Sequence, residues 1–284
     1  MKLSVAIATF KEEKNIEKCL NSIKEIADEI VIVDGSSTDR TVEIAAKFNA
    51  KIIVTTNPPI FHINKQKAID ASSGDWVLQL DADEVVSKKL SDEIEKVIKM
   101  SNEEIGEYEK NIPELFRRHQ DILKARDGQI GEETGEYNAF FIARSNYFLG
   151  RFLKYGGVYP DGVIRLFRKN KARLPQMDVH EQYDVSGRVG WLKENLLHYD
   201  SPTFSKYLKR NSRYTSLMAK QFREQKLSKN PLTAFNYLII KPIYWFLLTF
   251  IRHKGFMDSW QGFVFSFFSS LRFPISFIKY LLSN

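Results

Sequence analysis

Strands and helices alternate regularly through the first hundred residues, and this alternation limits the chain to few folds. Continuous β-branched runs are typical of buried strands, whereas apolar residues three or four positions apart predict helices. We expect strands at 3–8, 30–33, 51–54 and 76–80, and helices over 16–26, 42–48, 64–71 and 90–98. This order predicts an α/β protein with a parallel, doubly wound sheet.

Polar segments follow the first, second and fourth of these strands: TFKEE at 9–13, DGSS at 34–37 and DADE at 81–84. Ligands of such sheets bind beyond the carboxyl ends of the strands, so we expect the three segments to converge at one edge. Three carboxylates stand in the DADE segment and repel one another unless a positive charge lies among them. A divalent cation with oxygen ligands is one explanation, and the acidic first turn of a helix is the alternative.

Two further features concern a nucleotide. Asp34 ends a buried strand, where its carboxylate either accepts hydrogen bonds from a base or ribose or closes an Asx-type turn. The segment ATFKEEKNI contains neither GxGxxG nor GxxxxGK[ST], so neither a Rossmann dinucleotide site nor a P-loop is predicted. Without a glycine-rich cradle, a diphosphate has to be held by a metal ion and basic side chains.

The chain beyond residue 100 has three distinct parts. Residues 102–136 are highly charged and contain one expected helix, 112–125, which indicates a surface insert or lid. Strand character returns at 138–146 and 162–168. A basic helix is expected over 205–225. The sequence therefore predicts a catalytic domain over 1–204 and a helical region over 205–284.

The helical region is basic and aromatic. From Ser205 onward, thirteen Lys or Arg residues stand against two acidic residues, a surplus of +11, so the net charge of +7 leaves −4 for residues 1–204. Fifteen of the 37 aromatic residues lie between Phe235 and Asn284. A basic surface rich in aromatic residues favours a membrane interface with anionic lipid over nucleic acid.

Two stretches of this region, 235–251 and 263–282, are nearly long enough to cross a membrane. Both contain internal cations and a proline, which disfavours a span. We therefore expect them to lie in the interface, with Lys and Arg reaching lipid phosphate and Trp245 and Trp260 at headgroup level. The alternatives are a hairpin packed on the protein itself or in a homo-oligomer, and a true span.

The chain start and its single cysteine bear on the compartment. MKLSVAIATF has one lysine and only a strand-length apolar run, so no signal peptide is predicted. Cys19 stands at a helical core spacing and has no partner for an internal disulfide, which favours a reducing compartment. We expect a cytoplasmic protein, peripherally associated with the inner face of the plasma membrane.

The motifs ATFKEEKNI, VIVDGSSTDRT and GDWVLQLDADE, in this order, resemble the inverting family 2 glycosyltransferases with a GT-A fold, which is Rossmann-like. The resemblance implies a nucleotide pocket lined by Thr9, Glu12, Asp34 and, further away, Asp39. It also implies that Asp81 and Asp83 form a DxD pair, in which Asp83 binds the Mg²⁺ or Mn²⁺ that bridges the sugar-nucleotide diphosphate. Phe10-Lys11 departs from the family pattern of an aromatic residue followed by Asn.

A wider resemblance, to lipopolysaccharide-core β-glucosyltransferases, covers KQKAIDASSGDW, FLGRFLKYGGVYPDGVIRLFRKNKARLPQMDVHEQY and HYDSPTFSKYLKRNSRY. An inverting displacement needs a base that removes the proton of the acceptor hydroxyl. His180 and Glu181 are both available, and the family pattern favours Glu181. Asp161 is the next alternative.

Four basic residues are candidates for the diphosphate. Arg165 and Arg168 are three positions apart on an expected strand and therefore face opposite sides, so at most one of them reaches the site; we favour Arg165. Lys65 and Lys67 precede the GDW strand on an expected helix near the sugar nucleotide. A solvated helix face is the alternative for both lysines.

The sequence thus predicts a metal-dependent inverting glycosyltransferase. We expect it to move a hexose, glucose in the first instance, from a UDP-sugar to a glycolipid or lipid-linked saccharide in cell-envelope polysaccharide synthesis. One alternative is a sugar-1-phosphate nucleotidyltransferase, whose glycine-rich, Arg-containing loop is missing here. The other is a non-catalytic module that binds the membrane surface.

Overall fold

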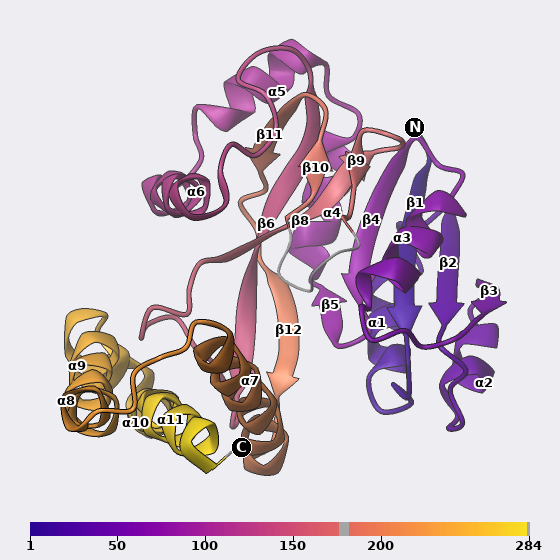
Figure 1. Ribbon diagram of the computed structural model, residues 1–284. Coiled ribbons are helices and arrows are strands. Elements are labelled where there is room, and N and C mark those ends of the chain that lie inside the picture. The colour runs from indigo at the N-terminus through magenta and orange to yellow at the C-terminus, as the bar shows by residue number, and fades with distance from the viewer. Residues whose placement is uncertain (176–181, 283–284) are drawn as a thin grey trace. The chain divides into compact units, whose positions relative to one another are not determined.

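The computed structural model describes residues 1–175 and 182–282 (Figure 1). The chain divides into two compact units. The first unit contains Met1–Arg144 and Pro160–His198, and the second contains Ser145–Tyr159 and Tyr199–Asn284. The helical unit therefore begins a few residues before the expected residue 205, and it includes a second segment, 145–159, that is distant in the sequence.

Four parallel strands form one side of the sheet of the first unit. They are β1 (Leu3–Thr9), β2 (Glu29–Asp34), β3 (Lys51–Val54) and β4 (Trp76–Asp81). Their order is β3-β2-β1-β4, and each neighbouring pair is parallel. The doubly wound, parallel arrangement predicted for the first hundred residues is confirmed. The middle strands are buried along their length, as their continuous apolar sequences require.

Beyond β4 the sheet is mixed, which the alternation of the first hundred residues did not reveal. β8 (Asp161–Arg168) is antiparallel to β4, and β6 (Tyr137–Phe148) is antiparallel to β8. The described strands continue as β8-β6-β12-β5, with β7 and β11 also paired to β6. The remaining strands are β5 (Glu84–Val86), β7 (Arg151–Phe152), β9 (Ala172–Arg173), β10 (Asp184–Val185), β11 (Arg188–Trp191) and β12 (Leu196–Ser201).

The helices of the first unit flank this sheet, and all except α3, whose buried residues are mostly polar, bury an apolar face. They are α1 (Ile16–Ile23), α2 (Thr41–Ala46), α3 (His62–Asp70), α4 (Lys88–Val97), α5 (Asn102–Glu109) and α6 (Glu114–Asp127). In α1 the buried residues recur three or four apart, from Ile16 to Ile23, and join the sheet core. The Ser87 side chain accepts a hydrogen bond from Leu90 N–H and caps α4.

The segment 102–136 forms two helices, where only one was predicted. The missed helix α5 has a capping box, in which Ser101 and Glu104 bond each other's backbone N–H. Part of α6 packs on the sheet: the rings of Phe116 and Trp191 are 4.9 Å apart, and His119 Nε2 accepts from Gly162 N–H at 3.2 Å. The segment therefore contributes to the core of the first unit.

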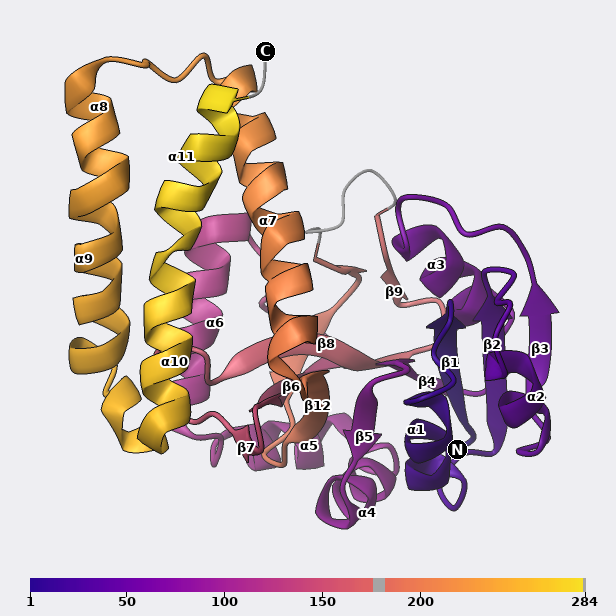
Figure 2. The ribbon, with the colours of Figure 1, turned by 90° about the horizontal axis from the view of Figure 1, so that it is seen from below.

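The second unit is a layered helical assembly (Figure 2). Its elements are α7 (Phe204–Glu224), α8 (Pro231–Phe235), η1 (Asn236–Ile240), α9 (Lys241–Leu247), η2 (Leu248–Arg252), η3 (Gly255–Asp258), α10 (Ser259–Ser270) and α11 (Arg272–Leu282). α8 to η2 form one continuous helix, Pro231–Arg252, which we call the outer helix. The π-helical segment η1 directly precedes Pro242, which has no N–H to give to a regular α-helical ladder.

Candidate active site

Strand register brings the three polar segments to one edge of the sheet. Thr9 is paired with Asp34 across β1 and β2, and Ala8 is paired with Asp81 across β1 and β4. The strands thus end at the same level, and the segments that follow them leave from a common edge. This is the ligand-binding edge of an open α/β sheet.

Asp34 links the first two segments. Its Oδ2 accepts from the hydroxyls of Thr9 at 2.8 Å and Ser37 at 2.7 Å, and its Oδ1 accepts from Ser37 N–H at 2.7 Å. The carboxylate is fully buried. Asp34 therefore closes an Asx-type turn and fixes the loop after β2 against the end of β1. Of the two roles considered for Asp34, the structure shows the turn-forming one.

The loop after β1 is fixed by hydrogen bonds to the segment that follows β2. Lys11 N–H donates to Ser37 Oγ and Glu12 N–H donates to Thr41 Oγ1, each at 2.8 Å. Asp39 accepts from Thr41 through Oδ1 and from Glu13 N–H through Oδ2 at 3.3 Å. The Glu12 carboxylate accepts from the Asn15 amide at 2.7 Å. The four residues assigned to a nucleotide pocket therefore belong to one hydrogen-bonded pair of loops.

Asp81 is neutralised by two cations of the protein itself. Its Oδ2 lies 2.7 Å from Arg165 Nη2, and its Oδ1 forms an ion pair with Lys65 Nζ. Both cationic side chains are buried. The sequence predicted a positive charge among the carboxylates. Arg165 and Lys65 of the chain itself supply it.

Glu84 is the second carboxylate neutralised in this way. It is completely buried, its Oε1 lies 2.7 Å from Arg165 Nη2, and its Oε2 accepts from Asp81 N–H at 2.9 Å. The other Arg165 nitrogen, Nη1, donates to Gln79 Oε1, which also accepts from the Tyr183 hydroxyl at 3.2 Å. Arg165 is therefore the centre of a buried network on β4, β5 and β8. We call these five residues, Gln79, Asp81, Glu84, Arg165 and Tyr183, the Arg165 network.

The electrostatics of the network follow from burial and from opposite charges. Burial alone would raise the pKa of Asp81, but Arg165 and Lys65 hold it well below its usual range. Burial lowers the pKa of Lys65, and this effect exceeds the opposing effect of Asp81. Burial also raises the pKa of the Tyr183 hydroxyl. Asp81 is thus ionised in the folded protein, and Tyr183 is a neutral hydrogen-bond donor.

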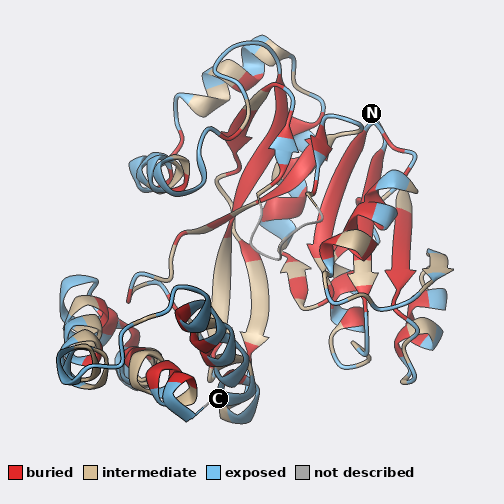
Figure 3. Cartoon of the chain, in the orientation of Figure 1, coloured by how far each residue is buried: buried red, intermediate tan, exposed pale blue. Residues whose placement is uncertain are grey.

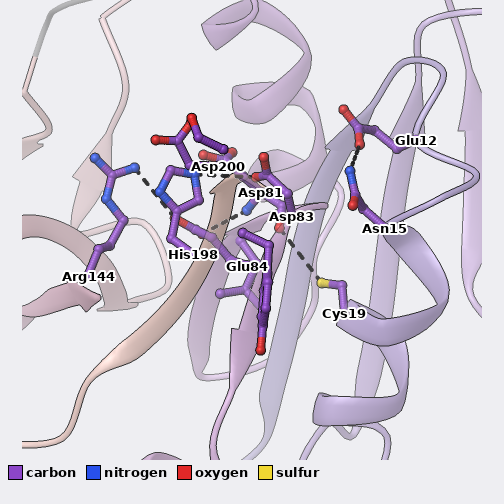
Figure 4. Close-up of polar contacts among 12 residues, drawn as sticks. Glu12, Asn15, Cys19, Asp81, Asp83, Glu84, Arg144, His198 and Asp200 are labelled. Carbon is purple, nitrogen blue, oxygen red and sulfur yellow. Dashed lines mark hydrogen bonds and ion pairs between the residues drawn. The ribbon is translucent and has the colours of Figure 1, made fainter. Parts of the chain in front are cut away.

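Asp83 has different partners from its two neighbours. Its side chain is 21% exposed, close to the 26% of Asp81 and unlike the 0% of Glu84, and its Oδ1 lies 3.5 Å from His198 Nε2 (Figure 4). His198 lies on β12, and its backbone is paired with Glu84 on β5. This pairing positions the imidazole beside the acidic segment. The sequence had given His198 no role, because only the fold brings it within reach of Asp83.

Arg144 within β6 and Asp161 at the start of β8 add a further ion pair. Arg144 Nη2 lies 2.8 Å from Asp161 Oδ2, and its Nη1 lies 3.7 Å from Glu84 Oε1. Neither Arg144 nor Gln79 was a predicted site residue. Gln79 had a visible signal, since it is the one polar residue in the apolar strand WVLQL, whereas Arg144 stood in a strand with no distinguishing pattern.

The other predicted residues are distributed as follows. Lys65 points into the site, whereas Lys67 is exposed and donates to Thr55 Oγ1 at 3.2 Å. Arg168 lies over the Trp76 ring at 4.7 Å, away from the carboxylates that bind Arg165. His180 and Glu181 lie outside the described residues, so the choice of base stays a prediction.

A metal site built by the protein alone is absent from residues 1–175 and 182–282, where no three His, Cys, Asp or Glu side chains are grouped to hold an ion. Asp83 and His198 would supply two ligands. Both oxygens of Asp81 have cationic partners, whereas Asp83 lies beside His198, so a cation bound at this pair would be held through Asp83. One or two protein ligands are enough where substrate phosphates complete the coordination of Mg²⁺.

We expect Arg165→Met to destabilise the first unit strongly. The substitution leaves the fully buried Glu84 and the partly buried Asp81 with much of their compensating charge removed, and breaking a buried pair costs about 3–5 kcal/mol. Urea unfolding at neutral pH measures this loss, with Arg168→Met as the control on the same strand. An unchanged unfolding midpoint for Arg165→Met would show that the network contributes no stability.

The same network predicts a dependence on pH. A carboxyl with a lowered pKa stabilises the fold above its unfolded-state pKa of about 4, and this contribution is lost as the pH falls through the lower folded-state value. Wild-type stability should therefore fall in acid more steeply than that of Asp81→Asn, which has no such group. Parallel stability curves of the two proteins below pH 5 would contradict the lowered pKa of Asp81.

Comparison with known proteins gives consistent results. The family model for glycosyl transferase family 2 matches residues 4–172. An uncharacterized glycosyltransferase of Rickettsia felis is 30% identical over 93% of this chain and 83% of its own length. The lipopolysaccharide core biosynthesis glycosyltransferase LpsC of Rhizobium meliloti is 25% identical over 95% of this chain and 91% of its own.

A solved structure extends the likeness to the fold. The mannosyltransferase PcManGT of Pyrobaculum calidifontis, in complex with GDP-Man and Mn²⁺, aligns with 100% of this chain and 88% of its own, with a TM-score of 0.51 and 11% identity. At this identity the match concerns the fold alone. The mixed sheet with its flanking helices is a GT-A fold.

Proposed function

We propose that this chain, which belongs to glycosyl transferase family 2, transfers a hexose with inversion from a nucleoside-diphosphate sugar to a lipid-linked saccharide. UDP-glucose is the first donor to test. The proposal rests on the different partners of the three carboxylates in DADE. Asp81 and Glu84 form ion pairs with buried cations, whereas Asp83 lies beside His198 at the ligand-binding edge.

The donor would bind beyond the carboxyl ends of β1, β2 and β4. The loops that contain Thr9, Glu12 and Asp34 are fixed to each other by hydrogen bonds, so this surface is preorganised for the base and ribose. Lys65 and Arg165 place two positive charges beside Asp81. We infer that their charge also favours the diphosphate, since no glycine-rich loop is available to hold it.

A divalent cation, Mg²⁺ or Mn²⁺, fits the residues present. Asp83 would hold it, with the neutral imidazole of His198 as a second ligand and the donor's diphosphate oxygens as the rest. Bound there, such an ion neutralises the charge that develops on the leaving diphosphate. That PcManGT was solved with GDP-Man and Mn²⁺ supports this choice of cofactor.

The remaining chemistry is a proton transfer at the acceptor. An inverting displacement requires a base opposite the leaving group, and Glu181 is our candidate. Tyr183, which follows Glu181 by two residues, donates to Gln79 within the Arg165 network. Tyr183 thus lies at the site. Because Glu181 is only two residues away in the sequence, this position supports its assignment as the base.

The acceptor and the cellular location are inferred from a relative and from the composition of residues 205–284. The likeness to LpsC, named for lipopolysaccharide core biosynthesis, supports a glycolipid acceptor in cell-envelope polysaccharide synthesis. A lipid-linked acceptor places the enzyme at a membrane, and the basic, aromatic segment 205–284 supports peripheral contact with the inner face of the plasma membrane.

A thermal-shift screen tests the donor assignment. UDP-glucose with Mn²⁺ should raise the unfolding temperature, because a ligand at 100 times its Kd adds about 2.7 kcal/mol to the free energy of unfolding. UDP-galactose, GDP-mannose and ADP-glucose serve as competitors, and EDTA should remove the shift. If no sugar nucleotide shifts the transition in the presence of Mn²⁺, the proposed function is wrong.

A further inference from the structure

The outer helix exposes a continuous apolar stripe to its surroundings. Residues three or four positions apart along its length are 44–80% exposed: Leu232, Phe235, Ile239, Ile243, Leu247 and Ile251. We call these six residues the outer stripe. Figure 3 colours much of the second unit's helices as exposed or intermediate. The helix is long and apolar enough to cross a membrane by length and composition, and only 11% of its apolar window is buried. A contiguous exposed apolar surface of this kind marks an interaction site.

The cations within the apolar helices are turned into the unit. Lys241 Nζ lies 3.6 Å from the centre of the Tyr237 ring, and the Arg272 guanidinium lies 3.9 Å from that of Trp245. Lys279 Nζ donates to the hydroxyls of Thr215 and Ser216, each at 2.9 Å. These contacts correct the expectation that internal Lys and Arg residues reach outward to lipid phosphate. They leave the outer stripe without a charge.

Exposed charge is positive at both ends of the outer helix. Lys226 and Lys229 precede it, whereas Arg252 and Lys254 end it, and all four are exposed. After Glu224 the sole acidic residue up to the last described residue, Leu282, is Asp258, which is 1% exposed and accepts from the backbone N–H groups of 154 and 155. The surface thus combines a neutral apolar centre with cationic ends.

We propose that the outer helix lies flat in the interface of an anionic lipid bilayer, with the outer stripe among the acyl chains and the four end cations at the phosphates. The inference deepens the proposed function, because a lipid-linked acceptor has to be met at such a surface. Aromatic residues beside the stripe fit the same position: Trp260 on α10 is 57% exposed, and Trp side chains prefer the headgroup level.

The packing of the second unit favours lying over crossing. The inner side of the outer helix packs on α10 and α11, and α11 packs on α7 through Phe277 and Tyr280. The exposed face of α7 carries five cations: Lys206, Lys209, Arg213, Lys220 and Arg223. A crossing orientation would bring this charged helix into the hydrocarbon or strip it from α11. A flat orientation keeps α7 in water.

Charge also favours lipid over a second copy of the chain. In a two-fold pairing of outer stripes, each end of one helix meets an end of the other. Both ends are cationic, so every such pairing places like charges together. Anionic headgroups are complementary to both ends at once, and each basic residue near such a surface favours binding.

Co-sedimentation with phosphatidylglycerol vesicles tests the proposal on the full chain. Ile243→Glu/Leu247→Glu places two charges in the outer stripe at positions that are 55% and 47% exposed, so the fold should tolerate them. Vesicle affinity should fall at least tenfold. Ile122→Glu is the matched control, since Ile122 is 63% exposed on α6 of the first unit. Equal affinity of the double variant and the control would overturn the proposal.

Two further readings separate the alternatives. Brominated lipids should quench Trp260 fluorescence, and alkaline carbonate should release the bound protein, whereas resistance to carbonate would show a span and overturn the flat orientation. A wild-type dimer that ignores vesicles and becomes monomeric in the double variant would show the second copy to be the occupant. Stabilisation by UDP-sugar should be the same in the double variant, which separates failure here from failure of the proposed function.

Discussion

Replacing Asp83 with asparagine should abolish Mn²⁺-dependent binding of the sugar nucleotide and leave the fold intact. The Asp83 side chain is 21% exposed and is not part of the Arg165 network, so we expect the fold to tolerate an amide of the same size. A metal ion held by one carboxylate, one imidazole and the donor loses its single anionic protein ligand. We expect at least a hundredfold loss of donor affinity with Mn²⁺ and little change in the unfolding temperature without ligand.

Two neighbouring variants make this experiment specific. Asp81→Asn removes the partner of Arg165 and Lys65 and should therefore lower stability as well as binding. Asp121→Asn, on the exposed face of α6, changes the same charge away from the site and should behave like the wild type. Calorimetric titration of UDP-glucose with and without Mn²⁺ measures the effect. If the Asp83→Asn protein keeps its Mn²⁺-dependent affinity for UDP-glucose, Asp83 is not the metal ligand.

The fold of the first hundred residues could be predicted because its signals are local. β-branched runs such as Ile30–Val33 and helical spacings such as Ile16–Ile23 each identify one element, and the alternation of elements fixes the parallel order. The later strands lacked this regularity. β5, β9, β10 and β12 are only two to six residues long, and antiparallel neighbours need no helix between them to reveal their order.

The site was predicted at the level of segments and less well at the level of charges. The convergence of the three loops followed from the parallel strands, and the observed register pairs Thr9 with Asp34 at this edge. The acidic cluster suggested a metal ion, but two of its carboxylates are neutralised by Arg165 and Lys65, which are 84 and 16 residues away from Asp81 in the sequence. The spacing of residues along a helix or strand predicts contacts within that element. It does not predict an ion pair with a residue of another strand or helix.

The same reasoning explains the cations of the helical unit. From the sequence, Lys241, Arg272 and Lys279 interrupt two apolar stretches and argue against a membrane span. Lys241 contacts the Tyr237 ring of its own helix, Arg272 contacts the Trp245 ring of the outer helix, and Lys279 donates to hydroxyl groups of α7. The sequence shows that these charges are present but not which way the side chains point. Their direction decides whether the exposed surface of the outer helix is polar or apolar.

Glu181→Gln should lose transfer and keep donor binding, because a base acts on the acceptor hydroxyl and not on the nucleotide. Positioned general bases contribute about 10²–10⁴-fold in rate, so kcat should fall by that factor while the Kd for UDP-sugar is unchanged. The variant keeps the size and hydrogen-bonding capacity of the side chain but has no proton acceptor. The pH dependence of the residual activity should lose its acidic limb, which a merely structural role would not change.

The competing bases supply the controls for this prediction. His180→Gln tests the adjacent residue, and Asp161→Asn tests the carboxylate that is held by Arg144 at 2.8 Å. Because this ion pair occupies one oxygen of Asp161, we expect Asp161→Asn to retain more activity than Glu181→Gln. Single-turnover transfer from UDP-glucose to a lipid-linked saccharide, with free UDP measured in parallel, compares the three variants. If Glu181→Gln transfers at the wild-type rate, the base is another residue, and the loss seen with His180→Gln or Asp161→Asn identifies it.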